Sequence, residues 1–310
     1  MTTPIGVIGG GAFGLGLARA ITNNGRKAVL FSRRGAGGEA IERARDLSEL
    51  GTCELIFVAV PSMHVANIAK ELGRHLDGRH LLVHVSRGLV GPELHTVSHV
   101  LRELTPVRRV GCLAGPLSAT ALAERIPGGG VIGTGFPEVR DAVMEAIASP
   151  HLRLYRSDDI IGVEVSAALV GLLALAVGYA NEMKLNSAAL AILATRGMVE
   201  TARIGVSLGG SERTFSGLAG YGDLISAIAG DSRPELELGH ALGRGLSLEE
   251  AGRTTKAYIE GVSIARNIQR HALRRGIAVP IIESLADAID GRLSPAGMIE
   301  RLMSRPTSRE

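Results

Sequence analysis

The chain has 310 residues, enough for one large domain or two ordinary ones, and its 45% hydrophobic and 21% charged residues are typical of a soluble globular protein. The formal net charge is +3 and no run of five or six like charges occurs, which excludes the basic surface of a nucleic-acid-binding protein. The two cysteines fit no metal-binding spacing and indicate a reducing compartment. The amino-terminal residues lack a signal-peptide pattern, so we expect a cytoplasmic protein without a metal site.

The first part of the chain alternates short apolar runs with helical patterns. The expected strands cover 5–9, 28–32, 55–60, 81–86, 109–114, 129–134 and 152–155. Strands that are apolar on both faces and separated by helices predict a parallel sheet covered on both sides.

From about residue 160 onward the pattern changes to helical periodicities alone. They cover 160–182, 186–207, 233–244, 247–274, 281–289 and 294–303. The sequence therefore predicts an α/β domain over 1–157 and an all-α domain over 158–310.

Residues 162–180, GVEVSAALVGLLALAVGYA, form the most apolar segment, with Glu164 as its only charge. Its length would suffice for a membrane span. The flanking residues lack the aromatic belt that anchors such spans. We therefore expect no membrane span and a helix buried at the centre of the all-α domain.

A glycine-rich loop follows the first expected strand. Gly9, Gly11 and Gly14 have the G-x-G-x-x-G spacing at the start of a helix. Such glycines allow a tight turn, the approach of a pyrophosphate and close packing of the helix on the strand, while the helix N-terminus attracts phosphate. The loop predicts a dinucleotide site, and a glycine-rich turn without a ligand is the alternative.

The end of the second strand indicates which dinucleotide binds. It reads FSRRG, and no acidic residue lies between Gly14 and Glu39 to bind the hydroxyls of an adenosine ribose. Arg33 and Arg34 stand where a 2′-phosphate would lie. We therefore expect NADP, with NAD possible; a solvated arginine pair is the alternative.

With these motifs the chain resembles the NAD(P)-dependent glycerol-3-phosphate dehydrogenases over nearly its whole length. The stretches that carry the resemblance are GVIGGGAFGLGLA, VAVPS, VSRGL, AGPLSA, DDIIGVEVSAAL, NSAALAILATRGMVETARIGVSLGG, TFSGLAGYGDL, DSR and YIEGVSIA. The resemblance implies a Rossmann domain followed by a helical domain of the type found at the C-terminus of 6-phosphogluconate dehydrogenase. It also implies an active site in the cleft between them, a small phosphorylated or carboxylated hydroxy or keto substrate, and a homodimer.

The resemblance assigns roles to individual positions. Those implied to bind the cofactor are Gly9, Gly11, Ala12, Phe13, Gly14, Ala119 and Glu260. Asp223 matches an aspartate next to the catalytic centre. Those implied to bind the substrate are Gly115, Asn186, Ser232 and Arg233.

Five positions depart from the family pattern. Val170 and Gly171 replace the catalytic lysine and the asparagine after it, Arg87 replaces the lysine of a Lys-Gly turn, and Leu117 and Pro234 replace a serine and an asparagine. Valine cannot protonate the alkoxide that hydride transfer to a ketone produces, whereas arginine can clamp an anion in two places.

Another group must therefore handle the proton. We expect Lys184 to do so if its loop folds back into the cleft, with His84 as second candidate, although each also fits a purely structural role. Reduction of dihydroxyacetone phosphate should then be slow. The sequence leaves open a keto-acid or imine reductase, since an iminium needs no proton in that step, and a catalytically weak dinucleotide-binding protein.

Overall fold

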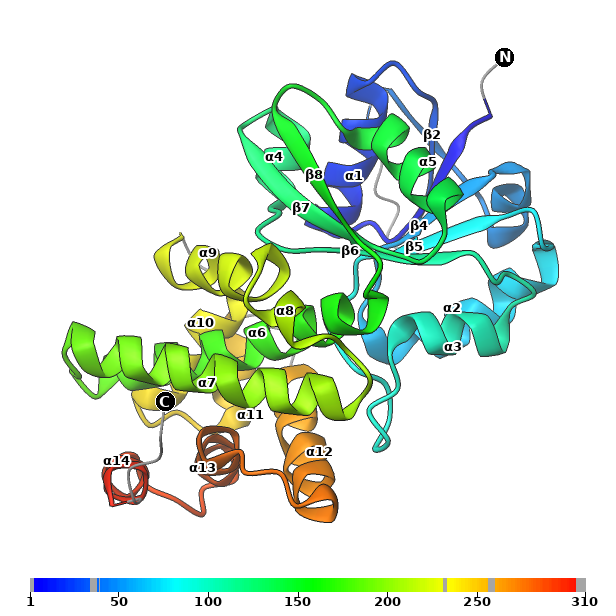
Figure 1. The fold of residues 1–310 in the computed structure, drawn as a ribbon. Coiled ribbons are helices and arrows are strands. Elements are labelled where there is room, and N and C mark those ends of the chain that lie inside the picture. Colours follow the sequence, from blue (N-terminus) through cyan, green and yellow to red (C-terminus); the bar gives the residue numbers. More distant parts are fainter. Residues whose placement is uncertain (1–2, 34–37, 39, 231–232, 256–259, 305–310) are drawn as a thin grey trace.

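The computed structural model describes residues 3–33, 38, 40–230, 233–255 and 260–304. Its amino-terminal half is built on one eight-stranded sheet with the order β3-β2-β1-β4-β5-β6-β7-β8 (Figure 1). The strands are β1 (Ile5–Ile8), β2 (Ala28–Phe31), β3 (Ile41–Arg43), β4 (Leu55–Val58), β5 (Leu81–His84), β6 (Val110–Ala114), β7 (Gly128–Gly133) and β8 (Leu152–Ser157).

Two features of this sheet differ from the sequence prediction. The three-residue strand β3 is additional, and it is too short to show a periodicity. The pairing of β6 with β7 is antiparallel, whereas all other neighbours in the sheet are parallel. The segment that joins β6 to β7 contains only one helix, of six residues. The chain therefore does not cross back over the sheet, and β7 begins beside the carboxyl end of β6 and runs in the opposite direction.

Helices cover both faces of the sheet, because most of its strands are apolar on both sides. One face packs against α1 (Ala12–Asn23), α4 (Ala119–Glu124) and α5 (Pro137–Ile147). The other packs against η1 (Leu47–Thr52), α2 (Ser62–Leu72), η2 (Gly73–His75) and α3 (Val97–Leu104). Figure 1 shows α1 and α5 above the sheet, with α2 and α3 below it.

The carboxyl-terminal half is helical from the end of β8 onward, and the change falls between Ser157 and Ile160. Its helices are α6 (Ile160–Glu182), α7 (Ser187–Ser207), α8 (Glu212–Phe215), the π-helical turn η3 (Leu218–Gly222), α9 (Asp223–Ala229), α10 (Pro234–Gly243), α11 (Leu248–Thr255), α12 (Glu260–Arg275), α13 (Pro280–Ile289) and α14 (Pro295–Met303). The expected helix over 247–274 is thus described as α11 and α12, and α8, η3 and α9 occupy a region where the sequence predicted no helix. The predicted domain boundary between residues 157 and 158 stays a prediction.

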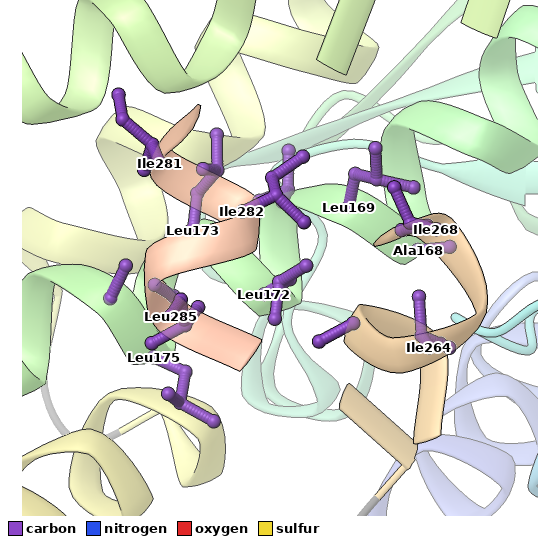
Figure 2. Close-up of a cluster of buried hydrophobic side chains, with 14 of the residues drawn as sticks. Ala168, Leu169, Leu172, Leu173, Leu175, Ile264, Ile268, Ile281, Ile282 and Leu285 are labelled. Atoms are coloured by element: carbon purple, nitrogen blue, oxygen red, sulfur yellow. The ribbon is translucent and has the colours of Figure 1, made fainter. Parts of the chain in front are cut away.

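Helix α6 is the centre of this half. Every residue from Gly162 to Ala180 is buried, and 89% of its most apolar 18-residue window lies inside the protein. Figure 2 shows leucines of α6, among them Leu169 and Leu172, facing Ile264 of α12 and Ile282 of α13. The segment that was long enough for a membrane span is therefore a core helix.

Helix α10 packs unusually close to α6. A Cβ atom at Gly178 of α6 would overlap the carbonyl oxygen of Leu236, and one at Gly239 of α10 would overlap that of Leu175. The two backbones touch at these glycines. This contact fixes the start of α10, which carries Arg233 and Glu235, beside the middle of α6.

Candidate active site

The glycine loop between β1 and α1 has the geometry that a dinucleotide needs. Gly9 adopts φ +119°, which side chains rarely allow, and a Cβ there would overlap the carbonyl oxygen of Ala59. A Cβ at Gly14 would overlap the carbonyl oxygen of Gly9, so this glycine lets α1 pack on the loop. At Gly11 the same atom would enter open space, where a pyrophosphate can approach.

The first turn of α1 also suits an anion. Gly11 precedes the helix without a side-chain cap, and the turn contains no acidic residue. Ala12 is exposed, and Phe13 packs partly buried against the apolar cluster of the sheet. The N-terminal dipole of α1 is therefore open to phosphate oxygens, and the loop fits a dinucleotide.

The remaining expected cofactor residues are described unevenly. Arg33 is exposed two residues after β2 ends, and Arg34 lies outside the described residues. Ala119 begins α4, and Gly16 of α1 packs against its backbone. Glu260 begins α12, but its side chain is outside the described part.

Four of the expected catalytic and substrate residues meet beyond the carboxyl ends of β5 and β6. Arg87 donates from Nη1 to Asp223 Oδ2 at 2.7 Å and from Nη2 to the Gly115 carbonyl oxygen at 3.1 Å. Arg233 donates from Nη2 to the same Asp223 oxygen at 3.4 Å and from Nη1 to the Asp223 carbonyl oxygen at 3.5 Å. We call Arg87, Asp223, Arg233 and Glu235 the cleft cluster.

Two hydrogen bonds connect the segment that carries Arg87 to the strand that precedes the glycine loop. Ser86 Oγ donates to the Val60 carbonyl oxygen at 2.7 Å, which ties the Arg87 turn to the segment after β4. Ala59, next to Val60, donates its N–H to the Ile8 carbonyl oxygen at 2.7 Å. Ligand sites of open α/β sheets lie at the carboxyl ends of the strands.

Burial governs the electrostatics of the cluster. The Asp223 side chain is only 2% exposed, and this burial raises the pKa of its carboxyl group, while the charge of Arg87 acts in the opposite direction. Burial alone would lower the pKa of Arg87, but Asp223 and, less strongly, Glu235 raise it. Because a guanidinium stays protonated, the 2.7 Å contact is an ion pair.

Sequence reasoning missed Glu235. Its Oε2 lies 3.5 Å from Arg233 Nε, and its Oε1 would lie 3.2 Å from a Cβ atom at Gly171. The glycine next to Val170 thus leaves the space that this carboxylate fills. The sequence did contain a signal for this change: the chain departs from the family pattern both at Gly171, which adjoins the Glu235 carboxylate, and at Pro234, which precedes Glu235.

Lys184 does not join the cleft cluster, which corrects our expectation. Helix α6 continues to Glu182, so Lys184 lies fourteen positions and about 20 Å along the axis from Val170. Its side chain is exposed, and Val170 itself is fully buried in the apolar core. Asn186 lies at the same distant end of α6, where its side chain accepts a hydrogen bond from Ala189 N at 2.9 Å and caps α7. Ser232 is outside the described residues.

His84 is buried in the sheet and does not reach the cleft. Its Nε2 lies 2.8 Å from Glu164 Oε1, with both side chains at most 1% exposed. Glu164 also accepts hydrogen bonds from Ser98 N at 2.7 Å and Ser98 Oγ at 2.6 Å. Burial alone would lower the pKa of His84, but Cys112 and Glu164 beside it raise the pKa. This is a structural ion pair.

Two surface cavities lie elsewhere. One of about 240 Å³ lies at the end of α1, beside Arg125 and His151. The other, of about 580 Å³, lies along α7, beside Phe215 and Tyr221. Neither is lined by the cleft cluster. Within the described ranges, no group of three metal-ligating side chains occurs.

Two family models match the chain. The C-terminal model of the NAD-dependent glycerol-3-phosphate dehydrogenases matches residues 159–300, and the N-terminal model matches residues 39–138. The chain is 32% identical over 322 residues to glycerol-3-phosphate dehydrogenase [NAD(P)+] of Azotobacter vinelandii, covering 97% of this chain and 94% of the relative. The enzyme of the same name from Rhizobium etli is 32% identical over 330 residues and is matched over 100% of both chains.

Solved structures agree with these matches. The crystal structure of glycerol-3-phosphate dehydrogenase from Coxiella burnetii superposes with a TM-score of 0.91 at 25% identity, over 98% of this chain and 99% of that one. A ketopantoate reductase from Ralstonia eutropha shares the fold at a TM-score of 0.61 and 14% identity, over 96% of this chain and 99% of that one. The expected fold class, a Rossmann α/β domain followed by an all-α domain, is confirmed. The chain belongs to the family of NAD-dependent glycerol-3-phosphate dehydrogenases.

Proposed function

We propose that this protein is an NADP-dependent dehydrogenase, able also to use NAD, that acts on a small anionic hydroxy or keto compound. The observation that carries the proposal is the convergence of Arg87 and Arg233 on Asp223, close to a glycine loop shaped for a dinucleotide. Family membership supports the same chemistry.

The residues of the cleft divide the work. When bound, the cofactor supplies or accepts the hydride. Gly11 and the N-terminus of α1 would hold its pyrophosphate. Asp223 fixes the two guanidinium groups, and Arg233, whose protein contacts are the longer ones, offers its donors to the anionic group of the substrate. Val170, at the position of the family's catalytic lysine, is buried and cannot donate a proton, so we assign proton transfer to water.

The substrate assignment is tested by a screen of NADPH oxidation against dihydroxyacetone phosphate, phosphorylated ketones and keto acids. Because position 170 is valine and not lysine, we expect turnover of dihydroxyacetone phosphate to be about 10²–10⁴-fold slower than general acid catalysis would allow. A kcat on that substrate within about 1–10³ s⁻¹ would contradict this expectation. Fast turnover of a keto acid or imine would favour the reductase alternative. Reduction of an iminium needs no proton donor in the hydride-transfer step and is therefore compatible with valine at position 170.

The role of Arg233 is tested on the best substrate of that screen. Arg233→Ala should raise KM about 10–100-fold, since a hydrogen bond to a charged group contributes about 1.5–3 kcal/mol, and should change NADPH affinity only a few-fold. Arg244→Ala is the matched control, because Arg244 follows the other end of α10 and pairs with Glu182. An unchanged KM would remove Arg233 from the substrate site, and a collapse of NADPH affinity would move it to the cofactor site.

We further propose that the protein is a homodimer, as the family resemblance implies, and that it is cytoplasmic, as its two free cysteines suggest. Sedimentation equilibrium tests the subunit count, and a mass equal to that of one chain would refute the dimer.

A further inference from the structure

Glu235 is held in the cleft by the packing of two helices. It is the second residue of α10, whose backbone touches α6 at Gly178 and Gly239. Gly171 lies about two turns before Gly178 on α6. It carries no side chain and leaves the space for the Glu235 carboxylate. The Glu235 side chain is 26% exposed, so it is accessible to solvent.

The carboxylate of Glu235 neutralises the cleft cluster. Arg87 and Arg233 contribute two positive charges, and Asp223 and Glu235 contribute two negative ones. Arg87 is committed to Asp223 and to the Gly115 carbonyl oxygen at 2.7 and 3.1 Å. The contacts of Arg233 to Asp223 and Glu235 are longer, at 3.4 to 3.5 Å, so we place an incoming anion at Arg233, beside Glu235.

Repulsion by Glu235 grows with the charge of that anion. Coulomb's law gives, at a separation of about 5 Å and with the dielectric constant of water, a roughly 4-fold weakening of a singly charged ligand and a roughly 16-fold weakening of a doubly charged one. A lower local dielectric constant increases both weakening factors, but the factor for the doubly charged ligand remains the square of the factor for the singly charged one. Glu235 therefore weakens the binding of a doubly charged anion more than that of a singly charged one.

We infer that Glu235 is a specificity-determining residue that lowers the affinity of this site for a doubly charged phosphate ester more than for a singly charged, carboxylate-bearing substrate. The inference rests on the proposed binding of the substrate anion at Arg233. It narrows the substrate class of the proposed dehydrogenase.

Sulfate and acetate probe this selectivity, because one stays a dianion and the other a monoanion near neutral pH. Their dissociation constants are measured by calorimetry on protein saturated with NADPH, which keeps the phosphate sites of the cofactor occupied. Glu235→Gln should tighten acetate binding about 4-fold and sulfate binding about 16-fold. Glu237→Gln is the matched control: it lies on the same helix, about 200° around the axis, and should change neither affinity.

The variant Arg233→Ala tests the proposed binding of the substrate anion at Arg233 separately from the inference about Glu235. If this variant weakens both anions while Glu235→Gln tightens neither, or tightens both by the same factor, the inference about Glu235 is wrong and the substrate site stands. If Arg233→Ala weakens neither anion, the substrate site itself is misplaced. Steady-state kinetics give a second readout: Glu235→Gln should raise kcat/KM for a phosphorylated ketone relative to a keto acid by about 4-fold, and an unchanged ratio would overturn the inference.

Discussion

Asp223 organises the cleft through a single oxygen atom. Its Oδ2 accepts hydrogen bonds from Arg87 at 2.7 Å and from Arg233 at 3.4 Å, although these arginines lie in opposite halves of the chain. A carboxylate that is 2% exposed and paired with a guanidinium is poorly placed to shuttle protons to water. We therefore assign to Asp223 the positioning of the two guanidinium groups.

Arg33 gives a residue-scale prediction about cofactor choice. It is exposed just beyond β2, where a 2′-phosphate would lie. Arg33→Ala should narrow the preference for NADPH over NADH by about 1–3 kcal/mol, because a charge-assisted hydrogen bond is lost. Dissociation constants of both cofactors, measured by fluorescence titration, check this. Arg43→Ala on β3 is the control, and equal affinities in the unaltered protein would refute the prediction.

The residues of the cleft were predictable to different degrees. The resemblance pointed to Arg87, Gly115, Asp223 and Arg233, and the structure brings them together. The expected position of Lys184 was wrong because it required a loop to fold back into the cleft, whereas α6 continues to Glu182. Glu235 was missed because its position depends on how closely α10 approaches α6, which no single-sequence periodicity encodes.

At the scale of elements, the apolar runs predicted most strands and the long helices. The direction of β7 was not predictable in this way, because an apolar strand has the same pattern in either direction. The burial of α6 was foreseen from its all-round apolarity and is seen in its contacts with α12 and α13 (Figure 2). What remained hidden was the glycine contact between α6 and α10.

Glu200 gives an element-scale prediction on pH. It joins α7 to α13 by accepting hydrogen bonds from Ile281 N at 2.9 Å and Ile282 N at 3.0 Å. Burial raises the pKa of Glu200 to about 7, although these hydrogen bonds lower it. The folded protein then binds the proton more tightly than the unfolded chain, whose value is 4.5. Its contribution to the free energy of unfolding is therefore complete below about pH 4.5 and is lost as the pH rises through about 7.

Glu200→Gln removes this titration. We expect the difference in unfolding free energy between this variant and the unaltered protein to shift by about 2–3 kcal/mol in favour of the variant between pH 5 and pH 8. Urea unfolding at several pH values measures it. Glu300→Gln, at an exposed position of α14, is the control. A difference that does not change with pH would show that the hydrogen bonds offset the effect of burial on this pKa.

At the scale of the whole molecule, the sheet and the helical half are joined by a buried contact. Val163 and Ala167 of α6 pack against Cys112 and Val131 of the sheet. Glu164, the residue after Val163, accepts two hydrogen bonds from Ser98 of α3 and lies 2.8 Å from His84 of β5. The only charge in the apolar stretch 162–180 is thus the point at which α6 is tied to both the sheet and a helix that covers it.

Loss of this tie should destabilise the whole protein. Glu164→Leu leaves the His84 imidazolium and the Ser98 N–H buried without their acceptor, and we expect it to lower the free energy of unfolding by about 3–5 kcal/mol in urea denaturation. The double variant His84→Leu with Glu164→Leu should recover a large part of that loss, since no unpaired charge then remains in the interior. The matched control lies on the same helix: Glu182 pairs with His240 at 2.9 Å, but the two side chains are 28% and 20% exposed. Glu182→Leu should therefore cost less than about 1 kcal/mol. If Glu164→Leu costs no more than Glu182→Leu, the buried pair does not join the two halves, and their apolar contact alone holds them together.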